Sequence, residues 1–153
     1  MNVILYTMRF RQAILVLTAV VFATADLVHK AVVPAELHHA RTPFAGLMMG
    51  GLVTALVVIV PRLPSNAAAI GAGVVCGGAL GNLVSLFAWS QGVPDPLMIA
   101  GETHALAFNL ADVFALVGDV LLLSAAVLHG VRHRGTLREP IELSAKAKAE
   151  LSP

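Results

Sequence analysis

Charged residues and cysteine are scarce in this chain. Charged side chains make up only 12% of its 153 residues, about half of the roughly 25% that is usual in soluble domains. A water-soluble globule is therefore not expected. The single cysteine, Cys76, excludes a disulfide-stabilised scaffold within one chain. The formal net charge is only +1, which argues against nucleic acid as a partner, because such proteins carry a strongly basic surface.

Apolar side chains take the place of the missing charge. Hydrophobic residues make up 58% of the sequence, and its mean hydropathy is +0.83. A chain this apolar is not intrinsically disordered. We therefore expect a small integral membrane protein, folded as a single domain at this length.

Four segments are long and apolar enough, or nearly so, to cross a bilayer as helices, which takes about 20 residues. They are residues 14–33, 44–60, 67–89 and 106–128. Two prolines separate the second segment from the third, and Asn66 is a candidate N-cap for the third. We expect an all-α membrane protein, with a four-helix transmembrane domain at 1–133 and a polar cytoplasmic tail at 134–153.

The basic residues predict how the helices are oriented, because lysine and arginine concentrate on the cytoplasmic side. With the N-terminus inside, eight of the ten basic residues lie inside and two outside. We therefore expect both termini to be cytoplasmic and the two small loops at 31–43 and 90–105 to be extracytoplasmic. The inside set is Arg9, Arg11, Arg62, Arg132, Arg134, Arg138, Lys146 and Lys148, and the outside set is Lys30 and Arg41.

The N-terminal segment has a second interpretation. Arg9 and Arg11, the apolar run 14–22 and the small residues 23–25 resemble a secretory signal peptide with its cleavage site. Cleavage there would leave three spans. The apolar run continues past residue 25, which favours a retained helix.

Three carboxylates, Asp26, Asp112 and Asp119, fall within the predicted spans. A charged side chain at the centre of a membrane costs about 2.5–3.5 kcal/mol on insertion scales, so such residues usually serve function or helix pairing. Asp119 is expected near mid-membrane, and our hypothesis is that it is protonated and hydrogen-bonded across to another helix.

Two acidic residues are predicted to converge at the extracytoplasmic end. Asn109 and Asp112 are three residues apart and share a helix face, Asn82 lies level with them, and Asp95 sits in the adjoining loop. Two close carboxylates share one proton, as in aspartic proteases. The alternative is that Asp112 caps the fourth helix or pairs with Lys30, while Asp95 is an ordinary loop acid.

Five short blocks occur in order between about residues 10 and 130. They are Asp26-Leu-Val-His-Lys30; His39-Ala-Arg41 followed by Phe44-Ala-Gly46; Gly77-Gly-Ala-Leu-Gly-Asn82; Gly92-Val-Pro-Asp95; and Phe108-Asn-Leu-Ala-Asp112 with Gly118 beyond. Together these blocks resemble the motifs of the signal peptidase II (prolipoprotein signal peptidase) family. The third and fifth blocks are specific in combination.

The resemblance implies a membrane aspartic endopeptidase that removes signal peptides from diacylglyceryl-modified prolipoproteins. It implies a multi-pass protein of a bacterial-type cytoplasmic (inner) membrane, in contact with lipid, with its site on the extracytoplasmic side. No metal or cofactor is expected, and the adjacent histidines 38 and 39 are expected to be solvated. The implied residues are Asp95 and Asp112 as the catalytic pair, with Asn82, Asn109, Asp26 and Lys30 supporting the site.

The chain departs from the family pattern at several positions. Ser85 and Leu86 stand where the family usually has Asp-Arg, Thr42 stands where it has Asn, and the first outer loop is short. Arg41 is our candidate to replace the missing arginine. These departures leave a non-catalytic relative, which binds lipoprotein, lipid or a membrane partner, as an alternative. A proton-coupled carrier is a third, although four spans without an inverted repeat are few for a carrier.

Overall fold

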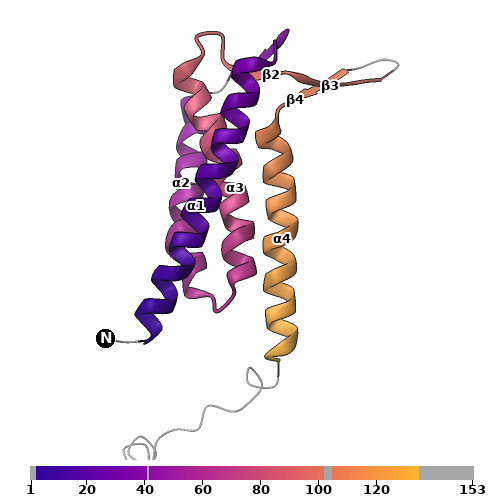
Figure 1. Cartoon of the computed structure of the whole chain (residues 1–153). Helices are drawn as coiled ribbons and strands as arrows, with labels where there is room; N and C mark the ends of the chain where they lie inside the picture. The colour runs from indigo at the N-terminus through magenta and orange to yellow at the C-terminus, as the bar shows by residue number, and fades with distance from the viewer. Residues whose placement is uncertain (1–2, 41, 102–104, 135–153) are drawn as a thin grey trace, which may run out of the picture.

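Four long helices form the structure, a computed structural model that describes residues 3–40, 42–101 and 105–134. They are α1 (Val3–Val32), α2 (Pro43–Ile59), α3 (Asn66–Ala88) and α4 (Leu110–Arg132), and a 3-10 turn, η1 (Val60–Arg62), follows α2. Each is long and apolar enough to cross a membrane. A largely helical membrane protein is thereby confirmed. The start of α1 and the end of α4 lie at the same end of the bundle (Figure 1). Beyond residue 134, the predicted tail lies outside the described residues.

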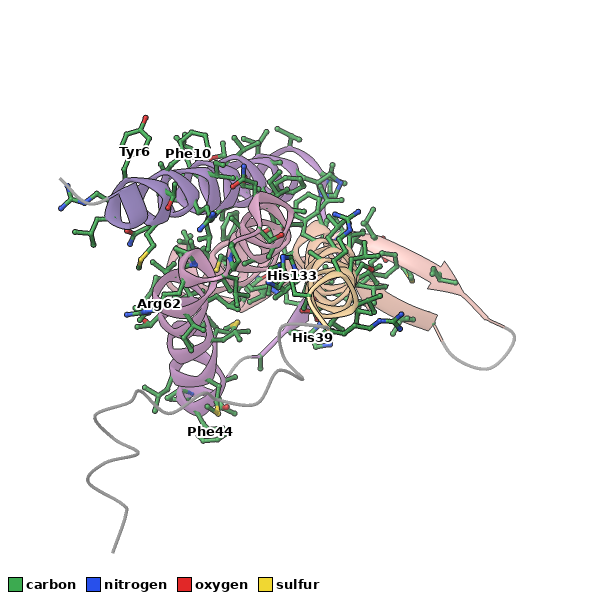
Figure 2. The ribbon with its side chains drawn as sticks, turned by 90° about the horizontal axis from the view of Figure 1, so that it is seen from below. Tyr6, Phe10, His39, Phe44, Arg62 and His133 are labelled. Atoms are coloured by element: carbon green, nitrogen blue, oxygen red, sulfur yellow. The ribbon has the colours of Figure 1, made fainter. Side chains whose placement is uncertain are left out.

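The central helix of the bundle is α3, which contacts α1, α2 and α4. It carries most of the buried side chains, and Cys76 is fully buried among them. Leu15 and Ala19 of α1, Val60 of η1 and Ala125 of α4 complete the apolar core. Large apolar side chains elsewhere face outwards. Tyr6 and Phe10 project from α1 away from the other helices in Figure 2, as expected of surfaces that face lipid.

Glycines on α3 allow its neighbours to approach closely. A methyl group at Gly73 would lie 2.7 Å from the carbonyl oxygen of Leu15, and one at Gly77 would lie 3.0 Å from that of Ala19. Gly81 continues this face one turn further on. Such spacing of small residues is typical of close helix pairs in membranes. The contact with α4 is made in the same way by Gly71, Gly78 and Gly118.

The boundaries of α2 and α3 lie within one residue of their predicted positions, whereas the start of α1 and both ends of α4, predicted at 106 and 128, differ by more. The cap of α3 is Ser65 rather than Asn66, since its side chain accepts from the N–H of Ala68 at 3.2 Å. The first helix begins at Val3 rather than at residue 14, because residues 3–13 contain no proline or glycine that would end a helix.

Short strands occupy the two segments that were predicted as plain loops. β1 (Leu37–His39) pairs antiparallel with β2 (Val93–Asp95), and β3 (Leu97–Ala100) pairs antiparallel with β4 (Ala105–Phe108). The all-α prediction was therefore incomplete. The last helix begins at Leu110 rather than at residue 106, because residues 105–108 bond to β3 instead. The β3–β4 hairpin projects sideways from the upper end of α4 (Figure 1).

Gly92 permits the close pairing of β1 with β2. It has a φ of +105°, and a Cβ there would lie 2.6 Å from the carbonyl oxygen of His39. A residue with a side chain would be strained at that φ as well as too close to β1. The register pairs His39 with Val93 and Leu37 with Asp95. As a result, the short β1 strand lies directly beside Asp95, one of the two predicted catalytic residues.

Candidate active site

Lys30 is the centre of a buried polar cluster between α1 and α3. Its ammonium group donates to Oδ2 of Asp26 at 2.6 Å, to Oδ1 of Asn82 at 2.8 Å and to Oγ of Ser85 at 3.3 Å. The side chains of Lys30 and Asp26 are both fully buried. A lysine ammonium has three N–H donors, so these bonds occupy all of them. Lys30 therefore forms its ion pair with Asp26.

The second oxygen of Asp26 holds the beginning of α4. Its Oδ1 accepts from the backbone N–H of Ala111 at 2.9 Å. That N–H belongs to the first turn of a helix, where backbone donors have no partner within the helix. A carboxylate from α1 thus supplies a cap for α4. Since Ala111 directly precedes Asp112, this bond fixes the turn that carries Asp112.

Asn109 and Asp112 form a reciprocal capping box at the start of α4. Oδ1 of Asn109 accepts from the N–H of Asp112 at 3.3 Å, and Oδ2 of Asp112 accepts from the N–H of Asn109 at 3.1 Å. The prediction that both residues lie on one helix face was wrong for Asn109, which is the N-cap. The three-residue spacing of a capping box is what brings them together.

Two asparagine side chains donate to the two acidic residues. Nδ2 of Asn109 donates to Oδ1 of Asp95 at 2.7 Å, and Nδ2 of Asn82 donates to Oδ1 of Asp112 at 3.4 Å. Asn109 therefore contacts both carboxylates, through its side chain on one and its backbone on the other. Asp95 is buried, whereas Asp112 is exposed. One carboxylate is enclosed by protein and its neighbour is open to the surroundings.

His39 contacts Asp95, although no role in the site was predicted for it from the sequence. Its Nδ1 lies in hydrogen-bond contact with Oδ2 of Asp95, although 60% of the His39 side chain is exposed. The expectation that this histidine is solvated is thus confirmed, but its contact with Asp95 was not predicted. Only the pairing of β1 with β2 reveals this contact, because 56 residues separate the two side chains in the sequence.

The residues that depart from the family pattern have defined places. Ser85 is fully buried and donates to the carbonyl oxygen of Gly81 at 2.7 Å, besides accepting from Lys30. Leu86 helps to line an open apolar groove of about 570 Å³ between α2 and α3. The other lining residues are Thr42, Pro43, Gly46, Leu47, Leu83 and Phe87. Arg41 lies outside the described residues, so its suggested replacement of the family arginine stays a prediction.

Asp119 does not bond to another helix, contrary to our hypothesis. Its side chain is exposed, and it makes no hydrogen bond within the part of the chain that the structure describes. The direction of α4 explains the difference. The neighbouring residue, Gly118, faces α3, where a Cβ would lie 2.6 Å from the backbone nitrogen of Val75. One residue further along a helix points about 100° away, which turns Asp119 outwards.

The cluster combines carboxylates, amides, one ammonium group and one imidazole. Such a set can hold and transfer protons between neighbouring oxygens and nitrogens. Within residues 3–40, 42–101 and 105–134, no group of three His, Cys, Asp or Glu side chains is placed to hold a metal ion. The chemistry that these residues themselves provide is that of acids and bases.

Comparison with known proteins gives a family for this chain. Residues 35–128 match the family described as signal peptidase (SPase) II. Lipoprotein signal peptidases of Nitrobacter hamburgensis and Rhodopseudomonas palustris are 38% and 39% identical over 77 and 75 residues, which are 48% and 46% of this chain and 47% and 46% of theirs.

A further lipoprotein signal peptidase, from Anaplasma marginale, is 35% identical over 97 residues, which are 63% of this chain and 57% of the relative. This chain thus spans about half the length of the curated relatives it matches. The family match covers most of the chain and includes the β1–β2 ladder, α3 and nearly all of α4. The chain therefore belongs to the signal peptidase II family.

Proposed function

We propose that this protein is a membrane aspartic endopeptidase that cleaves signal peptides from diacylglyceryl-modified prolipoproteins, with Asp95 and Asp112 as its catalytic pair. The observation that carries the proposal is the shared contact of both carboxylates with Asn109. Sequence similarity to lipoprotein signal peptidases supports the substrate class. The oriented carboxylates support the reaction class.

The surroundings of the two acids differ, and the difference assigns their roles. Asp112 accepts from Asn82 and from the backbone of Asn109. It also lies in the first turn of α4, where the helix dipole favours negative charge. Asp112 is exposed, whereas Asp95 is buried. We therefore assign to Asp112 the contact with water and the role of general base, and to Asp95 the proton that the pair shares.

The proposed reaction moves two protons and returns both. Asp112 takes a proton from water as the water oxygen bonds to the scissile carbonyl carbon, and Asp95 gives its proton to the carbonyl oxygen. The tetrahedral intermediate then collapses. Its C–N bond breaks as Asp112 protonates the leaving nitrogen, and a hydroxyl proton returns to Asp95 as the carbonyl re-forms. The net change is hydrolysis of one peptide bond, with the enzyme restored.

The proposed setting is the outer face of a bacterial cytoplasmic membrane. The distribution of basic residues supports this orientation. The candidate site lies at the end of the bundle opposite to the start of α1 (Figure 1). In this orientation it meets the interface between lipid and water, where the scissile bond of a lipid-anchored substrate would lie. The apolar groove beside Leu86 opens from the same end of α3.

The competing proposal is a family member that binds lipoprotein, lipid or a membrane partner without cutting. Ser85 favours it, because a serine that accepts from Lys30 replaces an acidic residue of the family pattern. Leu86 favours it too, because an apolar wall replaces a guanidinium group. The two proposals differ in one observable, which is hydrolysis.

The deciding experiment is a cleavage assay with the purified protein in detergent and a diacylglyceryl-modified prolipoprotein. Asp95→Asn and Asp112→Asn are run alongside, with Asp119→Asn as the matched control, because Asp119 is an exposed acid on the same helix as Asp112. We expect cleavage by the wild type and by Asp119→Asn only. Turnover by either of the first two variants would remove the assignment of the catalytic pair. A folded wild type that binds the substrate without cutting it would establish the non-catalytic alternative.

A further inference from the structure

Each carboxylate oxygen of Asp95 has a partner among the described residues, and one of the two partners is an imidazole. Its Oδ1 accepts from Nδ2 of Asn109, and its Oδ2 lies against Nδ1 of His39. The side chain of Asp95 is itself fully buried. An amide N–H can only donate. An imidazole nitrogen can either donate a proton or accept one. His39 is therefore the group in this contact set that can exchange a proton with Asp95.

The other charged groups described at the site have partners other than Asp95. The ammonium group of Lys30, on α1, donates its three N–H groups to Asp26, Asn82 and Ser85. Asp112 on α4 is held by N–H donors of Asn82 and Asn109. His38 is the other titratable residue of β1, and Arg41 lies outside the described residues.

The strand pairing holds His39 in this contact. β1 lies next to β2, with His39 opposite Val93 and Leu37 opposite Asp95. On an antiparallel pair, the side chains of diagonal neighbours on one face remain within reach of a long or aromatic side chain. Gly92 lets β1 come close at this point, because its missing side chain leaves room for the backbone of His39. Successive side chains of a strand point to opposite faces, so His38 is directed away from the face that His39 uses.

We propose that His39 and Asp95 together store the one proton that the reaction delivers to the scissile carbonyl oxygen. The inference rests on the proposed function and extends it by naming a residue that acts through Asp95. Before the reaction, the proton lies between Nδ1 of His39 and Oδ2 of Asp95. It passes from Asp95 to the carbonyl oxygen as water attacks, and it returns when the carbonyl re-forms. In this proposal His39 acts on the reaction only through Asp95, so it is a positioning residue rather than a catalytic one.

The consequence is a dependence on pH that carboxylates alone would not give. The imidazole of His39 is a further group, besides the two carboxylates, that can hold the stored proton. With His39 in place, the site should keep its proton, and its activity, to higher pH. Without His39, the fall of kcat/KM on the alkaline side should begin at lower pH.

The test compares pH profiles of kcat/KM for the wild type, His39→Asn and His39→Phe, with His38→Asn as the control on the same strand. Asparagine keeps an N–H near the place of Nδ1 but accepts no proton there, and phenylalanine keeps only the ring shape. We expect both His39 variants to lose activity at neutral pH, by at least about tenfold, with little change in KM. Their alkaline limbs should lie at least about one pH unit lower. His38→Asn should follow the wild type.

Several results would overturn the inference. One is a wild-type pH profile in both His39 variants. Another is a gain of activity in His39→Phe, which would show that the imidazole blocks Asp95. A third is full restoration by asparagine at every pH, because a neutral donor would then be sufficient.

A second measurement separates this inference from the proposed function. The 15N resonances of the His39 ring report whether Nδ1 is hydrogen-bonded, whether or not the protein cuts. We expect the hydrogen-bonded signal in the wild type and in Asp119→Asn, and its loss in Asp95→Ala. If the wild type does not cleave but shows this signal, the proposed function fails while the His39–Asp95 contact stands. If Asp95→Ala leaves the signal unchanged, the contact itself is wrong.

Discussion

Asn109 donates its side-chain N–H to Asp95 at 2.7 Å, and this bond joins the N-cap of α4 to the last residue of β2. The same side chain accepts from the backbone N–H of Asp112 through its oxygen, so the amide is held in one orientation. An aspartate in its place would set a third carboxylate against the other two. Asparagine is the residue that both caps the helix and donates to Asp95.

Replacing Asn109 with serine should separate these two roles. Serine is also a good N-cap, so the start of α4 should persist, but the N–H donated to Asp95 is lost. We expect kcat to fall by about tenfold or more, with the midpoint of thermal unfolding close to that of the wild type. Asn109→Ala should lose the cap as well, at a further cost of about 0.5–2 kcal/mol. Full activity in Asn109→Ser would show that the bond to Asp95 is dispensable.

Replacing Lys30 with methionine should destabilise the protein strongly. Breaking a buried ion pair by removing one partner typically costs about 3–5 kcal/mol, because the other charge is left uncompensated. Asp26 would keep only the N–H of Ala111 as a strong partner. The double variant Asp26→Asn/Lys30→Met removes that stranded charge, so it should unfold at higher denaturant concentration than Lys30→Met alone. Unfolding curves in detergent, followed by the fluorescence of Trp89, measure the order of the three proteins. If the double variant were less stable than Lys30→Met, the proposed contribution of the Asp26–Lys30 ion pair to stability would be contradicted.

Replacing Gly81, the residue that leaves space for the carboxylate of Asp26, should also destabilise the protein. A methyl group at Gly81 would collide with the carboxylate of Asp26, whereas one at Gly50 meets nothing within 4 Å. Gly81→Ala should therefore cost about 1–3 kcal/mol and reduce activity, because Asp26 would lose its place against α4. Gly50→Ala is the matched control, and it should be neutral or stabilising by up to about 1 kcal/mol, as usual for glycine replaced in a helix. Equal effects of the two changes would argue against close contact at Gly81.

The sequence was sufficient to predict that four helices exist and that Asp95, Asp112, Asn82 and Asn109 meet where α4 begins, but not to include His39. Hydropathy located α2 and α3 to within a residue, since an uninterrupted apolar run bounded by prolines leaves little choice. The three-residue spacing of Asn109 and Asp112 was interpreted as a shared helix face, which is wrong for Asn109. The alternative that Asp112 caps the fourth helix is confirmed by the capping box.

The features that the sequence did not predict depend on contacts between segments that are distant in the chain. The strands β1 and β2 have three residues each, too few to show an alternating pattern, so the meeting of His39 with Asp95 had no local signal. The direction of Asp119 is set by the rotation of α4 about its axis. That rotation follows from the contact of Gly118 with α3, which hydropathy does not reveal.

The groove between α2 and α3 should influence how tightly substrate binds rather than how fast it is cut. Gly46 borders this groove, and a Cβ there would lie 3.3 Å from Leu86. Gly46→Leu should therefore fill part of its volume without reaching the carboxylates. We expect a higher KM for a diacylglyceryl-modified substrate, by roughly three- to tenfold, and a kcat within about twofold of the wild type. Gly130→Leu is the control, because Gly130 lies near the far end of α4 with nothing within 4 Å of its Cβ position. An unchanged KM in Gly46→Leu would show that the lipid-modified substrate binds elsewhere, and a fall in kcat alone would place the effect at the catalytic pair.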